Sequence, residues 1–241
     1  MAVNQVSEDY VSSRFGRYLC VFDFETTGLP LKSKIHSDGY YPPEELVGYD
    51  TSRAVSLAWV IYDNINKTVE KKNHIIYPDG FVSSLGAFNV HGITDDYAKE
   101  VGVPISVVLN EFAIDLEKCG GLVGYNVSFD YHILLSECYR YNNRKLSQII
   151  QNLKDSGQIR CALKLAKNVL MYDANFKPRR KFYPKLEETY RYLFNQPDFK
   201  SSHDALDDTI KCGEIYYELL NRGHNNPILQ NLVNNVVNLD I

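Results

Sequence analysis

Two acidic residues interrupt an otherwise apolar stretch, CVFDFETTGLP at residues 20–30. The apolar run predicts a buried strand, and because successive side chains of a strand point to opposite faces, Asp23 and Glu25 share one face. Unpaired carboxylates are unfavourable to bury, so such a pair takes up protons, meets cations or binds metal. The ordinary alternative is a pair of strand-end acids that cap a helix or meet Lys and Arg. The polar turn that follows, Thr26 to Gly28, is typical of the strand ends where open α/β sheets hold their sites.

Apolar patterning predicts one α/β domain built on a sheet. Strands are expected at 18–24, 53–62, 68–77 and 121–125. Helices are expected at 104–120, 128–140, 161–171, 184–194 and 204–221. The predicted order is three strands, a helix, a strand, a helix and then mainly helices. This order favours a mixed sheet with helices on both faces. Residues 29–50 carry prolines, glycines and tyrosines without a regular period, which predicts a surface insertion near the site.

Composition indicates an ordinary globular chain with room for one sizeable core, since 44% of its 241 residues are hydrophobic and 23% charged. We expect an N-terminal extension at 1–17, the main domain at 18–222 and a C-terminal tail at 223–241. Five cysteines without a C-x-x-C pair fit reduced core residues of an intracellular protein. No apolar run approaches membrane-spanning length and MAVNQVSEDY lacks a signal-peptide pattern, so we expect a soluble cytoplasmic protein without membrane contact. With a net charge of −4, binding of a polyanion requires metal ions or a local basic patch.

Two further acids occur near predicted helix starts. Asp130 follows the strand end in YNVSFD and falls in the first turn of the next helix, where negative charge is favourable by itself by up to ~1 kcal/mol. In SSHDALDD, helical spacing places Asp208 on the inward face with Ala205, whereas Asp207 lies on a different face. Lys211, four residues after Asp207, is expected to pair with it at the surface.

The three acidic segments resemble the motifs of the DEDDh family of 3′→5′ exonucleases, which includes the proofreading epsilon-type subunits of bacterial replicative polymerases. DFETTG is similar to the first motif, YNVSFD to the second, and HDALDD to the third, H-x-A-x-x-D. NVHGIT at 89–94 and KLEETYRYLF at 185–194 extend the resemblance, which spans about residues 18–220. The sister group would carry a tyrosine where this chain has Asp204, so the histidine type is indicated. The resemblance implies an α/β, ribonuclease H-like fold, with a mixed five-stranded sheet and helices on both faces.

The resemblance also implies a metal-dependent mechanism at five residues. The ligands of two divalent ions, Mg²⁺ or Mn²⁺, would be Asp23, Glu25, Asp130 and Asp208. His203 would act as the general base, since histidine exchanges protons near neutral pH. One ion would lower the pKa of a bound water and the other would stabilise the leaving 3′ oxygen. The products would be nucleoside 5′-monophosphates released from a 3′ end.

Six further residues are implied to bind the end of the substrate. They are Thr26, Thr27, Gly28, Leu29, Asn126 and Phe129. The turn would receive the terminal 3′ hydroxyl through its backbone, the leucine would separate the last two bases, and the asparagine and phenylalanine would shape the pocket floor. His91 either lines the site or anchors NVHGIT by hydrogen bonds, and the structural role is favoured. The basic segment FKPRRKFYPK at 176–185 is a candidate strand-guiding patch or a solvated loop.

The sequence leaves the substrate and the partner open. Single-stranded DNA is favoured, with RNA trimming at 3′ ends as the alternative, because discrimination depends on how the pocket receives the 2′ hydroxyl. An apolar stripe in the tail, residues 228–237, either docks on its own domain or supplies a contact for self-association or for a polymerase. A catalytically silent nucleic-acid-binding module would normally have lost one of the five residues, and none is lost.

Overall fold

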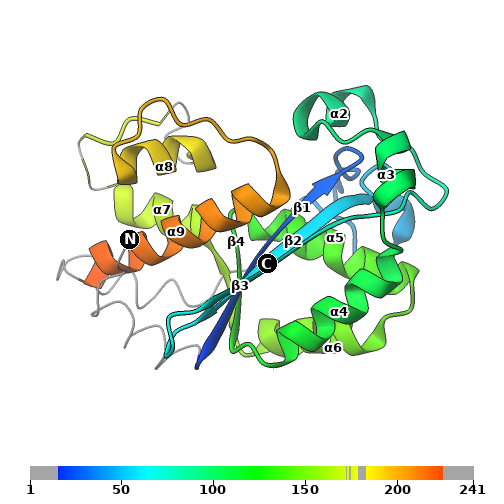
Figure 1. Cartoon of the computed structure of the whole chain (residues 1–241), viewed down its shortest axis with the longest axis horizontal. Helices are drawn as coiled ribbons and strands as arrows, with labels where there is room; N and C mark the ends of the chain where they lie inside the picture. The colour runs from blue at the N-terminus through cyan, green and yellow to red at the C-terminus, as the bar shows by residue number, and fades with distance from the viewer. Residues whose placement is uncertain (1–15, 172, 174, 179–182, 225–241) are drawn as a thin grey trace.

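A mixed five-stranded sheet forms the centre of the computed structural model (Figure 1). The structure describes residues 16–171, 173, 175–178 and 183–224. The strands are β1 (Tyr18–Thr26), β2 (Ala54–Asp63), β3 (Val69–Ile75), β4 (Gly121–Gly124) and β5 (Ile159–Cys161). They lie in the order β3-β2-β1-β4-β5, with β1 antiparallel to β2 and parallel to β4. The central strand β1 therefore joins an antiparallel half of the sheet to a parallel half.

Helices cover both faces of this sheet (Figure 1). One face carries α4 (Ile105–Glu117), α5 (Val127–Arg140) and α6 (Arg144–Asp155). The other carries α7 (Ala162–Leu170), α8 (Leu186–Phe194) and α9 (Ala205–His224). Side chains of β1 alternate between the two cores: Phe22 and Phe24 pack under the first set of helices, and Leu19 and Val21 under the second. The predicted fold class is confirmed.

Most predicted strands and helices lie within a few residues of the observed ones. The exceptions are α6 and β5, together with two short helices, α2 (Leu85–His91) and α3 (Asp95–Val101), which the sequence pattern did not predict. β5 has three residues, too few to show the alternation that identifies a strand, and it pairs in parallel with β4. The fifth strand was therefore expected from the family resemblance alone.

The predicted insertion at residues 29–50 lies against α5 and contains one 3₁₀ turn, η1 (Leu46–Tyr49). Tyr49 is fully buried, and its hydroxyl donates to a backbone carbonyl within the insertion. At the end of α5, the Arg140 guanidinium donates to Asp50 at 2.8 Å and to the Leu46 carbonyl at 3.3 Å. The insertion is thus anchored by its own tyrosine and by the helix that carries Asp130.

Several predictions fall outside the described residues. These are the tail stripe at 228–237, residues 179–182 of the basic segment, and the N-terminal extension up to residue 15. The domain boundaries at 17/18 and 222/223 stay predictions. None of the helices in the described part of the chain combines the length and apolarity needed to cross a membrane.

Candidate active site

Asp23 and Glu25 lie on the face of β1 that α9 covers, the same face as Leu19 and Val21. Pairing between β1 and β2 is regular through Glu25, and the register shifts directly after it. The two carboxylates therefore stand side by side where the central strand is about to end, as the sequence predicted.

Asp130 reaches the same place from the first turn of α5. Its Oδ1 accepts a hydrogen bond from the Phe24 backbone N–H at 3.2 Å, and its side chain is almost fully buried. Because Phe24 lies between the two strand acids, this bond fixes the third carboxylate directly beside them.

Asp208 comes from α9 and faces inward, as helical spacing predicts. It is 9% exposed, and Ala205, one turn earlier, is buried against the neighbouring elements. The hydroxyl of Ser201 lies 2.7 and 2.8 Å from its two carboxylate oxygens. The fourth carboxylate is therefore held by a serine from the loop before its helix.

The predicted ion pair between Asp207 and Lys211 is wrong. Asp207 Oδ2 accepts a hydrogen bond from the Ser202 hydroxyl at 3.0 Å. Lys211 Nζ instead lies 3.2 Å from Glu214 Oε2 and 4.8 Å from the centroid of the Tyr190 ring. The lysine turns towards α8 because an aromatic ring and a carboxylate both attract its charge there.

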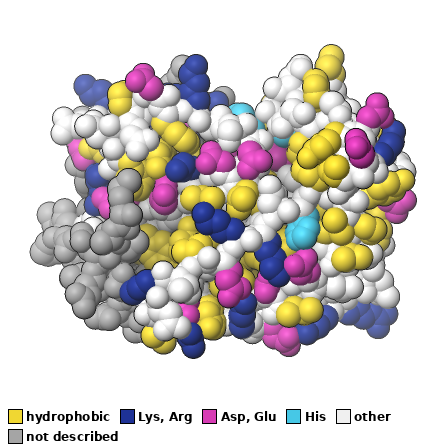
Figure 2. Space-filling model, in the orientation of Figure 1, with side chains coloured by type: hydrophobic (Ala, Val, Ile, Leu, Met, Phe, Trp, Pro, Cys, Tyr) yellow, Lys and Arg dark blue, Asp and Glu magenta, His cyan; other side chains and the backbone are white. Residues whose placement is uncertain are grey.

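His203 stands at the start of α9, exposed, with its backbone in the left-handed region at φ 51°. One ring nitrogen of His203 and one carboxylate oxygen each of Glu25 and Asp208 all lie within 4.8 Å of one another. These residues border a cleft of about 220 Å³. It is lined by Asp23, Phe24, Glu25, Tyr125, Asn126, Phe129, Asp130, Leu186, His203 and Asp208. In the space-filling view, acidic and histidine side chains gather near the notch where α9 begins (Figure 2).

Burial raises the pKa of every carboxyl group in this cleft, and repulsion from the other cleft acids adds to the shift of Asp23 and Glu25. Burial raises the pKa of Asp23 well above its ordinary value, and the charges of Asp130 and Glu25 raise it further. Burial is the largest cause that raises the pKa of Glu25 to about 8, and the negative charges of neighbouring acids add to the shift. Burial also raises the pKa of Asp130 to about 7. The pKa of Asp208 is raised by burial as well, although the hydrogen bond from Ser201 opposes this shift.

This donor set fits hard divalent cations. Carboxylate oxygens are the ligands that Mg²⁺ and Mn²⁺ prefer, and four of these groups converge from β1, α5 and α9. The raised pKa values mean that the cluster binds protons unless other positive charge is present. Positive charge in the cleft would therefore offset the repulsion between the acids.

The turn after β1 is held by the residues that precede β2. The Thr27 backbone N–H donates to the Arg53 carbonyl at 2.9 Å, and the Arg53 N–H donates to Thr27 Oγ1 at 2.9 Å. A Cβ added to Gly28 would stand 2.9 Å from the Thr51 carbonyl oxygen, so a side chain does not fit there. Leu29 follows with its side chain 75% exposed. The turn is thus fixed in backbone and presents one apolar side chain to the outside.

Two of the six implied substrate residues line the cleft. Asn126 and Phe129 belong to its wall, whereas the turn residues 26–29 lie beyond it. His91 takes the structural role: its Nδ1 accepts a hydrogen bond from the Ile93 N–H at 3.0 Å.

Three residues around the cleft were not among the predicted site residues. Tyr125 and Leu186 line it, and the Tyr125 hydroxyl donates to the Pro184 carbonyl at 2.8 Å, which connects the end of β4 to the segment before α8. Ser201 is the third. Its place near the third motif was visible in the sequence, but its contact with Asp208 depends on how the loop folds back.

The fold and the site together define a ribonuclease H-like exonuclease domain. The chain belongs to the RNase T exonuclease family, of the DEDDh 3′→5′ type, whose sequence profile matches residues 20–216. No curated protein sequence matches it.

Solved structures of nucleases share the fold. Cell-death related nuclease 4 matches with a TM-score of 0.56 and 17% identity, over 86% of this chain and 64% of the other. E. coli Exonuclease I in complex with a dT13 oligonucleotide matches with a TM-score of 0.62 and 18% identity, over 90% of this chain and 43% of the other. A 3′-exonuclease that recognises the histone mRNA stem-loop matches with a TM-score of 0.56 and 15% identity, over 85% of this chain and 63% of the other. The chain thus spans less than two thirds of the length of these proteins.

Proposed function

We propose that this chain hydrolyses the terminal phosphodiester at the 3′ end of single-stranded nucleic acid, with DNA favoured, and releases nucleoside 5′-monophosphates. The observation that carries the proposal is the convergence of four carboxylates with His203, whose ring nitrogen lies within 4.8 Å of the ligand oxygens of Glu25 and Asp208. Family membership over residues 20–216 supports the same reaction.

Each group of the cleft has a role in this reaction. Asp23, Glu25, Asp130 and Asp208 would hold two Mg²⁺ or Mn²⁺ ions, which supply activation of water and neutralisation of phosphate charge. His203 is exposed at the cleft mouth and accepts the proton that the attacking water loses. The hydrogen bond from Phe24 to Asp130 keeps that carboxylate fixed while charge changes around it.

Recognition of the end falls to groups that do not read base identity. The ring of Phe129 offers a stacking surface within the cleft, Asn126 offers an amide, and the exposed Leu29 would separate the last two bases. The turn Thr26, Thr27 and Gly28 would receive the 3′ hydroxyl through its backbone. Apolar stacking suits a site that must accept any nucleotide.

Single-stranded DNA is the favoured substrate, and RNA trimming is the second candidate. The structural relative Exonuclease I with dT13 supports DNA, and the exonuclease of the histone mRNA stem-loop supports RNA. The alternatives of a polymerase-bound proofreading subunit or self-association rest on the tail at 228–237, outside the described residues. A silent binding module is disfavoured because all five catalytic positions are filled.

The test is cleavage of 3′-labelled and 5′-labelled single strands of DNA and of RNA, with and without Mg²⁺. We expect the 3′ label to leave as a mononucleotide in the first cleavage, and the 5′ label to give a ladder of progressively shortened strands. Circular single strands should resist. Equal cleavage of circles, or full activity in excess chelator, would contradict the proposal.

A further inference from the structure

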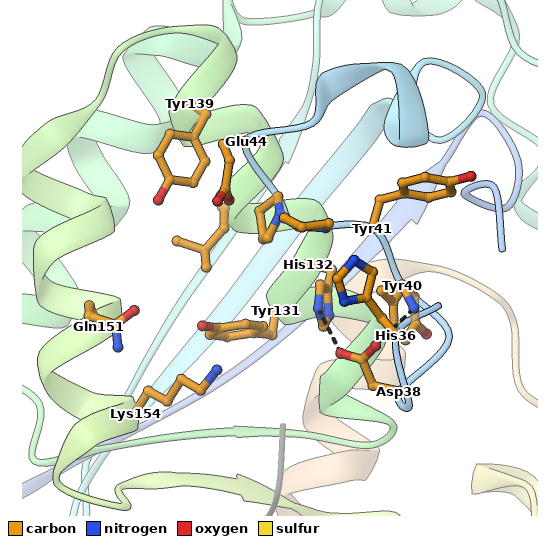
Figure 3. A pocket seen from close by; sticks show the side chains of 13 residues that line it. His36, Asp38, Tyr40, Tyr41, Glu44, Tyr131, His132, Tyr139, Gln151 and Lys154 are labelled. Carbon is orange, nitrogen blue, oxygen red and sulfur yellow. Dashed lines mark hydrogen bonds and ion pairs between the residues drawn. The ribbon is translucent and has the colours of Figure 1, made fainter. Parts of the chain in front are cut away.

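A second cleft of about 320 Å³ lies between the insertion and helices α5 and α6 (Figure 3). It shares no lining residue with the catalytic cleft. From the insertion come His36, Asp38, Tyr40, Tyr41, Pro42, Pro43 and Glu44. From the helices come Tyr131, His132, Leu135, Tyr139, Gln151 and Lys154. The insertion thus creates a hollow that the sheet and its helices alone would not form.

Aromatic rings dominate the lining. The Tyr40 ring stacks on the His132 ring, with centroids 4.3 Å apart and planes 13° from parallel (Figure 3). Tyr139 leaves 48% of its surface exposed at the rim. Flat, partly exposed rings of this kind bind other flat rings by stacking.

The polar groups of the cleft favour a neutral ring over a phosphate. Lys154 Nζ lies 5.0 Å from the centroid of the Tyr131 ring and has no carboxylate partner in the described part of the chain, so it remains able to donate. Asp38 Oδ2 lies 3.4 Å from His132 Nε2, and Glu44 adds a second carboxylate. Two carboxylates against one lysine repel phosphate, whereas a heterocycle with donors and acceptors on its edge can use both kinds of group.

Helix α5 connects this cleft to the catalytic one. Asp130 faces β1, and the next two residues, Tyr131 and His132, line the second cleft. The ring of Tyr40 stacks on His132, two residues after Asp130, so this part of the second cleft lies beside the start of α5. A strand whose 3′ end lies at Asp130 therefore has the second cleft within reach around the start of α5.

We propose that the second cleft binds a nucleobase of the substrate strand upstream of the 3′-terminal nucleotide. The assignment rests on the proposed function, which supplies a chain of flat heterocycles. Stacking on the ring of Tyr40 holds the base, and Lys154 donates to an acceptor on its edge. Affinity then increases with the length of the strand, independently of the chemistry at the 3′ end.

Photocrosslinking locates the base directly. The full chain with Asp208→Asn, which keeps the probe from being shortened, is irradiated with a short oligothymidylate carrying one 5-iodouracil at successive positions, and crosslinks are mapped by mass spectrometry. We expect the 3′-terminal base to crosslink to Tyr125 or Phe129. Upstream bases should crosslink to Tyr40, Tyr131 or Tyr139. A parallel arm uses free 5-iodo-deoxyuridine monophosphate.

Binding measurements on matched variants provide the second readout. Tyr40→Ala should weaken binding of longer oligonucleotides by about 5- to 100-fold, the range for loss of one base–aromatic stack, and leave dinucleotide binding unchanged. Tyr40→Phe keeps the ring and should bind like the parent. Lys154→Met removes the donor and should weaken binding of longer strands by about two- to tenfold, the range for loss of one hydrogen bond. Lys145→Met, at a residue of the same helix that pairs with Glu117 at 2.7 Å, should have no effect.

The outcomes separate this inference from the proposed function. Crosslinks confined to Tyr125 and Phe129 at every position, with unchanged affinities, overturn the second subsite while cleavage by the parent chain persists. Crosslinking of the free nucleotide alone in the second cleft overturns its assignment to the strand. Absence of 3′-end cleavage by the parent chain overturns the proposed function, whatever the crosslinks show.

Discussion

The hydroxyl oxygen of Ser201 lies 2.7 and 2.8 Å from the two carboxylate oxygens of Asp208, and it also accepts a hydrogen bond from the His203 backbone N–H at 3.3 Å. One small side chain therefore contacts both the acid that α9 contributes and the residue proposed to move the proton. The next serine, Ser202, donates to Asp207 in the same way but at the exposed side.

Ser201→Ala should reduce metal affinity by about 10- to 100-fold, because a hydrogen bond to a charged group contributes ~1.5 to 3 kcal/mol. Calorimetric Mg²⁺ titration measures this directly. Ser201→Thr retains the hydroxyl and should recover most of the affinity. Ser202→Ala, the matched control, should titrate like the parent; equal losses in both alanine variants would show that the contact with Asp208 has no special role.

Asp208→Asn should abolish turnover and weaken metal binding, since it removes one of four charges that the cations need. Asp207→Asn should leave both near the parent value because Asp207 contacts Ser202, away from the cleft. Parallel metal titrations and single-strand cleavage assays measure both. If Asp207→Asn reduced turnover and metal binding more than Asp208→Asn did, Asp207 would be the metal ligand.

His203→Ala should keep metal affinity and lose a factor of ~10² to 10⁴ in turnover, the usual contribution of a general base. The separation follows from its exposed position, since the carboxylates alone supply the preferred ligands. The loss of turnover is measured at saturating metal, and the metal affinity is measured by titration of the same preparation. A parallel fall in metal affinity would assign His203 to the ligand set instead.

The protein freed of metal should lose stability as the pH rises towards 8. The folded state raises the pKa of Glu25 from 4.5 to about 8 and that of Asp130 from 3.8 to about 7, so it binds these protons more tightly than the unfolded chain. The stabilisation from these bound protons is fully present below the pKa values of the unfolded chain. It is lost as the pH rises through the pKa values of the folded state. Melting temperatures in excess chelator should fall from about pH 4 to about pH 8, the range between the unfolded and the folded pKa values.

Added Mg²⁺ should reverse most of that loss and should release protons on binding. Calorimetry in two buffers of different ionisation enthalpy counts those protons. Glu25→Gln is the control, because it removes the titrating group and should flatten the slope. A melting temperature that rises with pH in chelator would contradict the assignment of raised pKa values.

The buried pair between Arg53 and Glu137 should matter for folding far more than a surface pair. Arg53 Nε lies 2.8 Å from Glu137 Oε1, and the second side chain is 2% exposed. Glu137→Ala leaves a buried guanidinium without its partner and should cost about 3 to 5 kcal/mol in the free energy of unfolding. Glu117→Ala removes an exposed pair with Lys145 and should cost less than ~1 kcal/mol. Urea denaturation measures both, and equal effects would contradict the difference in burial.

Local pattern predicted the part of the site that depends on strand and helix period. Alternation placed Asp23 and Glu25 on one face of β1, and helical spacing turned Asp208 inward, because both periods are fixed by backbone geometry. Helical spacing also predicted an ion pair between Asp207 and Lys211, and this prediction is wrong. A half-buried lysine can reach several partners of similar energy, and the ring of Tyr190 comes from a separate helix that the spacing does not reveal.

The elements that the sequence did not reveal are short or depend on contacts made elsewhere. β5 is recognisable only from its pairing with β4, and α6 buries just Leu146, Ile150 and Leu153 among twelve mostly polar residues. The second cleft could not be predicted at all. It forms where the insertion folds onto α5, and no periodic pattern encodes that contact.

The left-handed backbone of His203 has an evolutionary consequence. Residues with a Cβ are disfavoured in this region by ~1 to 2 kcal/mol, whereas glycine is not. Selection for heat resistance alone would therefore enrich glycine at position 203, and each such variant would gain robustness by discarding the imidazole. The histidine at this position therefore combines a backbone cost with the imidazole that the proposed reaction uses.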